Sequence, residues 1–246
     1  MNALIQTELL KLRTIRSPWL ILSAAPLVII AGISGIVTSS TRLHQAAAQS
    51  DAMAHIGLTS LFTLLFGITA VAGEYRHKTI TDTYLSTPAR REVIAAKIAV
   101  YTTAGALSGV VTTMAGLVTA AAWWAGKGVP YSWSDSAMWT TIGGGIAWNA
   151  AFAAIGVGLG ALVRNLVGAV ALALAWVALV EGLVGQLIGN LARWLPFNAG
   201  QALGSAAKVH VTSGQLPRWG AGVVLVLYTI AFAAAAVTTS MRRDVA

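Results

Sequence analysis

The chain has 246 residues, of which 57% are hydrophobic and 10% are charged, a composition far outside that of soluble domains and typical of membrane proteins. The net charge of +8 does not indicate a nucleic-acid-binding protein, because no basic soluble segment with interleaved aromatic residues carries it. The absence of cysteine excludes disulfides and thiolate metal sites.

Residues 2–16 predict an amphipathic helix that precedes the first apolar run. Its apolar residues at the spacing of helical turns are Leu4 or Ile5, Leu9, Leu12 and Ile15. The helix is too short and too charged to cross a membrane, so we expect it to lie along the inner membrane surface as an interfacial entry helix. Ser17 and Pro18 then supply an N-cap and a first-turn proline for the next helix.

Six apolar stretches follow, each near or above the roughly 20 residues that cross a hydrocarbon core of about 30 Å. They predict an all-α integral membrane protein with a single transmembrane domain. The predicted spans cover residues 18–40, 56–73, 98–124, 137–163, 166–192 and 220–240. The polar connections that matter most are a cytoplasmic hairpin over residues 74–97 and an external segment over residues 193–219.

Charge predicts the orientation. If both termini are cytoplasmic, most of the 16 lysine and arginine residues fall on the cytoplasmic side, as the positive-inside rule requires. Tryptophans cluster near the proposed outer ends of the spans, at the depth of the lipid headgroups; they are Trp123, Trp124, Trp133, Trp139, Trp194 and Trp219.

The densest polar segment is GEYRHKTITDTYLSTPARREVIAAK, residues 73–97, between two long apolar runs. Its TITDTYL stretch can form about two helical turns, with Ile80 and Tyr84 one turn apart. Proline then ends this helix, because it disfavours helical geometry in the preceding residue. We therefore expect a short cytoplasmic helix that exposes Ile80 and Tyr84.

A long helix is predicted to follow, with Thr87 as N-cap and Pro88 as its first residue, running to Trp124. At about 1.5 Å per residue it measures roughly 55 Å, more than a membrane requires. The surplus should project into the cytoplasm and present the short helix to a soluble protein. The alternative is an ordinary solvated loop whose charges satisfy the positive-inside rule.

This segment resembles the connection between the second and third spans of type-2 ABC transporter permeases. In that family a Glu-x-Arg-x-x-Thr-Ile stretch, a Leu-x-Thr-Pro turn and a downstream lysine recur, and all three are present here. The WLPFNAGQAL stretch at residues 194–203 also resembles the external segment of the family. With the entry helix and six spans, the similarity covers nearly the whole chain.

The resemblance implies a permease in a bacterial plasma membrane, one that forms a homodimer, binds two copies of a cytoplasmic ATPase, and exports a small molecule, peptide or lipid-like substrate. The coupling helix that docks into the ATPase would comprise Thr79, Ile80, Thr81, Asp82, Thr83, Tyr84, Leu85 and Ser86. ATP and magnesium would bind to the partner, because this chain has no G-x-x-x-x-G-K-[ST] sequence. We expect no enzymatic activity, cofactor or metal site in the chain itself.

Glu181 is the only acidic side chain deep within a predicted span. A carboxylate in hydrocarbon costs about 2.5 to 3.5 kcal/mol on insertion scales, so it must face protein or a water-filled path. Two roles are open, a structural hydrogen bond or a lining of the substrate pathway together with the adjacent Gln186. Asn149, in the fourth span, is a further pathway candidate, although an interhelical hydrogen bond is favoured.

Two other classes of function would use the same features. In an ion-coupled secondary transporter, Glu181 would bind a proton or cation, but the sequence shows no inverted repeats or paired broken helices. In a membrane anchor for a cytoplasmic protein, the hairpin would be the binding element.

Glu74 lies at the cytoplasmic end of the second span, where a carboxylate opposes the helix dipole by about 0.3 to 1 kcal/mol. With Arg76 it belongs to the permease-like motif. We expect Arg13 or Arg16 of the entry helix to bind Glu74 and to couple hairpin, entry helix and span. The alternative is an exposed ion pair with no mechanical role.

Small residues recur at helical spacing in several spans. GVGLG at residues 156–160 is not preceded by a strand, so it predicts close helix packing rather than a nucleotide site. Gly105 with Gly109, and Gly185 with Gly189, predict the same.

Overall fold

The structure is a computed structural model that describes residues 2–39, 46–87, 89–204 and 215–242. The secondary structure of these residues is helical throughout, and it includes one π-helical segment, η1. The helices are α1 (Asn2–Thr14), α2 (Ser17–Ser39), α3 (Ala46–Leu58), α4 (Ser60–Arg76), α5 (Ile80–Ser86), α6 (Arg90–Gly126), α7 (Ser136–Val163), α8 (Leu166–Ala175), η1 (Trp176–Glu181), α9 (Gly182–Leu187), α10 (Gly189–Ala192), α11 (Pro196–Gly204) and α12 (Arg218–Arg242).

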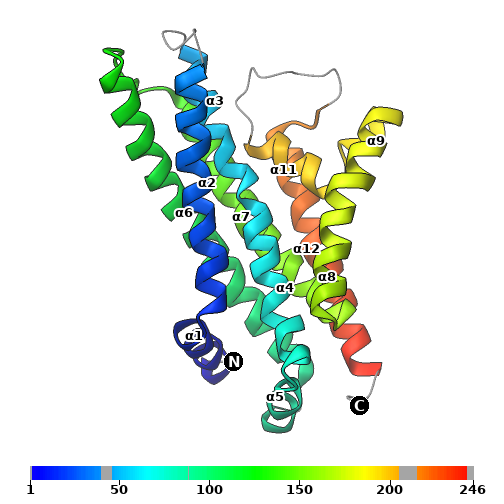
Figure 1. Cartoon of the computed structure of the whole chain (residues 1–246). Coiled ribbons are helices and arrows are strands. Elements are labelled where there is room, and N and C mark those ends of the chain that lie inside the picture. Colours follow the sequence, from blue (N-terminus) through cyan, green and yellow to red (C-terminus); the bar gives the residue numbers. More distant parts are fainter. Residues whose placement is uncertain (1, 40–45, 88, 205–214, 243–246) are drawn as a thin grey trace.

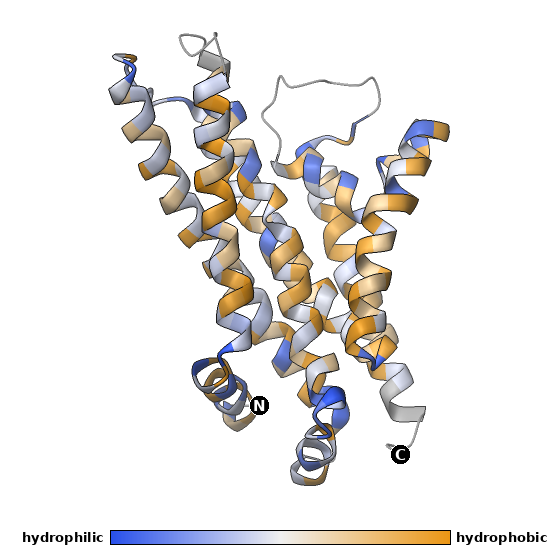
Figure 2. Ribbon diagram, in the orientation of Figure 1, coloured by the Kyte–Doolittle hydropathy of each residue, from blue (hydrophilic) through white to orange (hydrophobic). Residues whose placement is uncertain are grey.

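Within the described part of the chain, six helical stretches are long and apolar enough to cross a membrane, which confirms the predicted all-α membrane fold. They are α2, the α3–α4 pair, α6, α7, the α8–η1–α9 series and α12. Figure 2 shows hydrophobic residues along these helices and hydrophilic residues concentrated in α1 and α5.

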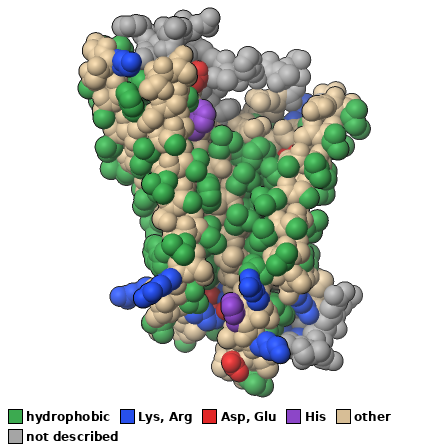
Figure 3. All heavy atoms as spheres, viewed as in Figure 1, with side chains coloured by type: hydrophobic (Ala, Val, Ile, Leu, Met, Phe, Trp, Pro, Cys, Tyr) green, Lys and Arg blue, Asp and Glu red, His purple; other side chains and the backbone are tan. Residues whose placement is uncertain are grey.

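Helices α1 and α5 lie together at one end of the bundle, which we call the α1 end (Figure 1). The described C-terminal part of α12 reaches the same end, and α11 lies toward the opposite end (Figure 1). Most of the Lys and Arg side chains visible in Figure 3 gather at the α1 end. This charge distribution agrees with the positive-inside rule, and the assignment of the α1 end to the cytoplasm stays a prediction.

Helix α7 is the centre of the bundle, because α3, α4, α6, α11 and α12 all pack against it. Glycines make these contacts close. A Cβ atom on Gly156 would overlap the backbone of α4 at Leu64, and one on Gly158 would press on Phe232 of α12. Gly105 of α6 similarly faces the α7 backbone, so the predicted close packing through these glycines is confirmed.

Gly185 has a more open environment than these glycines. Gly185 is exposed, and the nearest atom to a Cβ placed on it is the Ala192 Cβ, 4.0 Å away. Among the described residues, no atom of another span lies within 4 Å of that Cβ position, so close packing at Gly185 and Gly189 stays a prediction.

The second span begins earlier in the structure than in the prediction, because α3 continues it back to Ala46. Polar residues such as Gln49 hid this helix from a hydropathy reading. The Gln49 amide donates to the Pro130 carbonyl at 3.1 Å and accepts from the Ser132 amide at 2.8 Å. A polar helix is stable here because the loop after α6 satisfies the hydrogen-bonding groups of its Gln49 side chain.

The fifth span was predicted as one run over residues 166–192, but the structure interrupts it. Helix α8 widens into η1, and α9 ends at Leu187 because Ile188 leaves helical geometry with φ of −139°. Helix α11, in the predicted external segment, then folds back against α7. Gly200 of α11 lies so close to the Trp148 ring of α7 that a Cβ atom would overlap it.

The Gly156 contact gives a test of the fold. We expect Gly156→Ala to destabilise the protein by about 1 to 3 kcal/mol, because the added methyl group meets backbone that cannot rotate away. Gly143→Ala on the same helix is the matched control, since nothing lies within 4 Å of its Cβ position. Thermal unfolding in detergent measures both, and equal midpoints would contradict the α4–α7 packing.

Candidate functional site

The short helix predicted between the second and third spans is present as α5, but its orientation is opposite to the predicted one. Ile80 is only 3% exposed and Tyr84 only 8%, so neither is available to a soluble partner. Both pack on Val93 of α6, and Leu4 of α1 and Tyr75 of α4 complete the cluster. The prediction that Ile80 and Tyr84 form the exposed face was therefore wrong.

The outward face of α5 is formed by the remaining turn positions. Leu85 is 77% exposed, and Thr81, Asp82 and Ser86 are exposed beside it. Thr79, just before the helix, is exposed, whereas Thr83 is half-buried. Helical periodicity alone could not predict which face of α5 is exposed, because Ile80 and Tyr84 share one side of the helix whether that side faces inward or outward.

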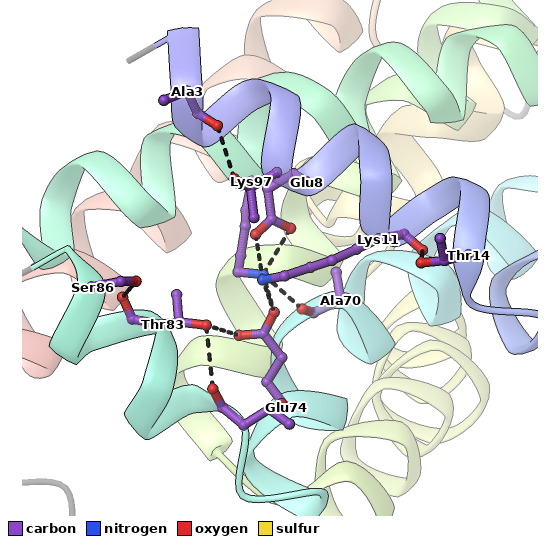
Figure 4. Close-up of polar contacts among 11 residues, drawn as sticks. Ala3, Glu8, Lys11, Thr14, Ala70, Glu74, Thr83, Ser86 and Lys97 are labelled. Carbon is purple, nitrogen blue, oxygen red and sulfur yellow. Dashed lines mark hydrogen bonds and ion pairs between the residues drawn. The ribbon is translucent and has the colours of Figure 1, made fainter.

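Next to α5, four charged side chains from three helices form one cluster: Glu8 and Lys11 of α1, Glu74 of α4 and Lys97 of α6 (Figure 4). We call it the ion-pair cluster. Lys97 Nζ donates to Glu8 Oε2 at 2.9 Å, to Glu74 Oε1 at 2.6 Å and to the Ala70 carbonyl at 3.2 Å. Lys11 Nζ donates to Glu8 Oε1 at 2.8 Å and to Glu74 Oε1 at 2.7 Å.

The ion-pair cluster is balanced in charge; Glu8 and Lys97 are buried, and Lys11 and Glu74 are partly buried. Lys97 is fully buried, and its three contacts use all three N–H donors of its ammonium group. Burial lowers the pKa of Lys11, but hydrogen bonds to Glu74 and Glu8 outweigh it and leave this pKa above its usual value of 10.5. Lys11 therefore stays charged at neutral pH, and its stabilising contribution is lost only as pH rises above about 10.5.

Helix α5 joins the ion-pair cluster through Thr83. Its hydroxyl donates to Glu74 Oε2 at 3.4 Å, as Figure 4 shows. Lys78, in the turn between α4 and α5, adopts a left-handed conformation with φ of 58° that reverses the chain here. Helices α1, α4, α5 and α6 are thus tied together at one point.

The structure corrects the predicted partner of Glu74, whereas its predicted coupling role stays a prediction. Glu74 does bind the entry helix, but through Lys11 rather than Arg13 or Arg16, both of which are exposed. Lys11 is three residues from Glu8 and shares its face of α1, whereas Arg13 is five residues away and points to another side. Arg76 is also exposed and lies outside the cluster.

Sequence reasoning missed Glu8 and Lys97 as members of the site. Glu8 carried a usable signal, because it lies four residues from both Leu4 and Leu12 and so shares the face that packs against the bundle. Lys97 carried a weaker one, as the only charged residue between Glu92 and Lys127 on the long helix. A charge on an apolar face calls for a buried counter-charge.

Glu181 has well-defined partners near the other end of the bundle. Its carboxylate accepts from the Phe197 amide at 3.0 Å, the Asn198 amide at 2.9 Å and Asn198 Nδ2 at 2.9 Å. These donors lie in the first turn of α11, so Glu181 caps that helix from another element. These contacts are the kind of structural hydrogen bond that the sequence allowed, and a pathway role for Glu181 stays a prediction.

The other two pathway candidates differ in their surroundings. Asn149 is buried, donates to the Ile56 carbonyl at 3.1 Å and the Gly145 carbonyl at 2.9 Å, and accepts from Thr59 at 3.3 Å. It thus provides the interhelical hydrogen bond that the sequence favoured, at the break between α3 and α4. Gln186 is exposed on α9, whereas Glu181 is buried.

The described residues thus contain six candidate spans, with a short docked helix between the second and the third. The sequence model of the ABC-2 family transporter proteins matches residues 4–180, and the chain belongs to that family. The match confirms the resemblance to type-2 ABC permeases and covers α5 and the whole ion-pair cluster, ending one residue before Glu181. The chain is thus the membrane subunit of an ABC transporter. No curated protein matches the sequence.

The ion-pair cluster gives a double-mutant test. Lys97→Met leaves two buried carboxylates with one lysine, so we expect a loss of about 3 to 5 kcal/mol in stability. Adding Glu8→Gln restores charge balance around Lys11 and Glu74. The double variant should therefore lose less stability than the sum of the losses of the two single variants. Thermal unfolding of the parent and the three variants measures the cycle.

Arg91→Met is the control for that cycle, because Arg91 is exposed on the same helix and should change stability by no more than about 0.5 kcal/mol. Strictly additive losses at Lys97 and Glu8 would contradict a shared buried cluster.

The cap on α11 gives a second test. Glu181→Gln replaces one acceptor oxygen with a donor amide, so at least one N–H of α11 loses its partner, at about 1 to 3 kcal/mol. We expect faster hydrogen–deuterium exchange over residues 196–204, and no such change for the exposed control Gln186→Ala. Unchanged exchange combined with altered transport would instead assign Glu181 to the substrate pathway.

Proposed function

We propose that this chain is the membrane subunit of an ATP-driven exporter and that α5 contacts a separate cytoplasmic ATPase. The observation that supports the proposal most is the division of α5 into two faces. Its inward face, Ile80 and Tyr84, is fixed to α1, α4 and α6, and its outward face presents Leu85. An exposed leucine on a small, firmly anchored helix is suited to a protein contact.

The ion-pair cluster supplies the route by which movement of the ATPase would reach the spans. A displacement of α5 acts on Glu74 through Thr83, on α6 through the packing of Ile80 and Tyr84, and on α1 through Lys11 and Lys97. Because a buried charge cannot leave its partners cheaply, these elements should move as one body. The second and third spans would then transmit the movement across the membrane.

The complete transporter, in this proposal, contains two copies of this chain and two ATPase subunits that bind ATP and magnesium. It resides in a bacterial plasma membrane with the α1 end in the cytoplasm, and it exports a small molecule, peptide or lipid-like substrate. The positive charge at the α1 end supports this orientation. The family supports the ATPase partner, because its members are membrane subunits of ABC transporters.

The competing functions receive less support from the geometry. A secondary transporter would need Glu181 free for a proton or cation, but both of its oxygens accept hydrogen bonds from α11. A membrane anchor would use α5 in the same way, and it is distinguished by the lack of coupled transport. Reconstitution separates all three, since ATP-dependent flux supports the exporter and ion-driven flux without an ATPase supports the secondary transporter.

The proposed contact gives a sharp mutational test. Leu85→Asp should abolish most copurification of the ATPase, because it replaces the exposed apolar side chain of α5 with a charge. The amount and thermal stability of the membrane subunit should stay near those of the parent, since Leu85 packs against little of the chain. Copurification from detergent extracts measures the effect.

Leu191→Asp is the matched control, as it changes an exposed leucine outside the α1 end. Ile80→Asp should differ from both variants, because it destabilises α5 itself. Full retention of the ATPase by Leu85→Asp would count against α5 as the docking element.

A further inference from the structure

The corner between α1 and α2 carries positive charge that the rest of the described chain leaves unneutralised. Arg13 and Arg16 take part in none of the ion pairs of the ion-pair cluster. Both arginines are exposed. Glu8, the only acidic residue of α1, is buried on the opposite side.

Large apolar side chains surround these arginines. Leu10 is 60% exposed and Trp19 is 55% exposed, and Leu9 and Ile15 are also exposed. The Trp19 indole N–H donates to the Leu12 carbonyl at 2.6 Å, which fixes the ring across the corner. The outer face of the corner therefore consists of Leu9, Leu10, Arg13, Ile15, Arg16 and Trp19.

The ion-pair cluster determines which side of α1 becomes this outer face. At about 100° per residue, Arg13 lies about 140° around the helix from Glu8. Since Glu8 is held inward by Lys97 at 2.9 Å, Arg13 must point away from the bundle. Leu9 and Leu10 flank Arg13 on the same side, so the charge and the apolar surface cannot be separated by rotating α1.

The corner also lies where a membrane boundary must be. Helix α2 begins at Ser17, directly after Arg16, and is one of the candidate spans. Leu20, in its first turn, is 72% exposed. A cationic and apolar surface beside the start of a span is the chemistry of a headgroup region, in which arginine meets phosphate and tryptophan anchors at the same depth.

We propose that the outer face of the α1–α2 corner is a binding surface for anionic phospholipid. Arg13 and Arg16 contact the headgroup phosphates, Leu9, Leu10 and Ile15 enter the acyl boundary, and Trp19 lies between them. The positive charge selects anionic over zwitterionic lipid. The exposed leucines select a lipid over free phosphate, which offers them no apolar surface. This surface is separate from α5 and does not depend on an ATPase.

Lipid binding is measured by titrating the purified full-length chain with short-chain phosphatidylglycerol or phosphatidylcholine and counting bound lipids by native mass spectrometry. The parent should bind phosphatidylglycerol more tightly than phosphatidylcholine. The double variant Arg13→Gln with Arg16→Gln should weaken phosphatidylglycerol binding roughly 25-fold, at about fivefold per basic residue. Its binding of phosphatidylcholine should stay as in the parent.

Three further variants and one competitor make the result specific. Arg76→Gln with Arg91→Gln removes the same charge from exposed positions outside the corner and should leave the lipid preference intact. Arg13→Lys with Arg16→Lys should restore most of it, because charge is retained. Leu9→Gln with Leu10→Gln should weaken the binding of both lipids without changing the ratio of their affinities. Inorganic phosphate should not displace phosphatidylglycerol.

Several outcomes would overturn the proposal. Unchanged preference in the Arg13 and Arg16 double variant would show that the corner does not select lipid charge. Equal loss in the Arg76 and Arg91 variant would reduce the effect to net charge, and efficient displacement by inorganic phosphate would assign the arginines to a free anion. Loss of the ATPase interaction through α5 would leave the lipid titration unchanged, so the two proposals fail separately.

Discussion

The buried ion-pair cluster is the constraint on which the α1 end of the bundle depends. Glu8, Lys11, Glu74 and Lys97 come from three helices, and each charge is compensated only when the others are in place. Removing ions from water is expensive, and their mutual attraction repays that cost only in good geometry with further hydrogen bonds. The cluster therefore contributes less to net stability than to position, since it specifies where α1 lies and how it is rotated.

Two kinds of contact hold this membrane protein together, and they act in different places. At the α1 end, ion pairs join α1, α4 and α6, a contact that hydropathy does not predict. Within the spans, glycines such as Gly156 and Gly105 bring backbones close, because the hydrophobic effect does not drive helices together in lipid. Helix α7 collects the close contacts, whereas α4 takes part in both kinds and connects the middle of the bundle to α5.

The sequence was sufficient for the spans and the family but not for the pairing of charges. Apolar length identifies a span because the membrane imposes it, and the glycines of residues 156–160 favour close helix packing because small residues let backbones approach. Periodicity shows that Ile80 and Tyr84 share a face, but not that Val93 covers it. Lys97 and Glu8 are 89 residues apart, and nothing local in the chain encodes their contact. Polar helix α3 resembled a loop for the same reason, because its partners lie beyond α6.

The π-helical turn η1 explains how an acidic residue is tolerated in a span whose other side chains are largely exposed. Ala173 faces the bundle and Glu181 follows it by eight residues, on the same buried side. Two regular turns take about 7.2 residues, so an unbroken α-helix would carry Glu181 well past that side. A π-turn adds about one residue, which brings Glu181 back to the face of Ala173 and directs its carboxylate at α11. The distortion and the buried carboxylate thus form a single feature. The wide turn without Glu181 would leave the first N–H groups of α11 uncapped. Glu181 without the wide turn would face lipid.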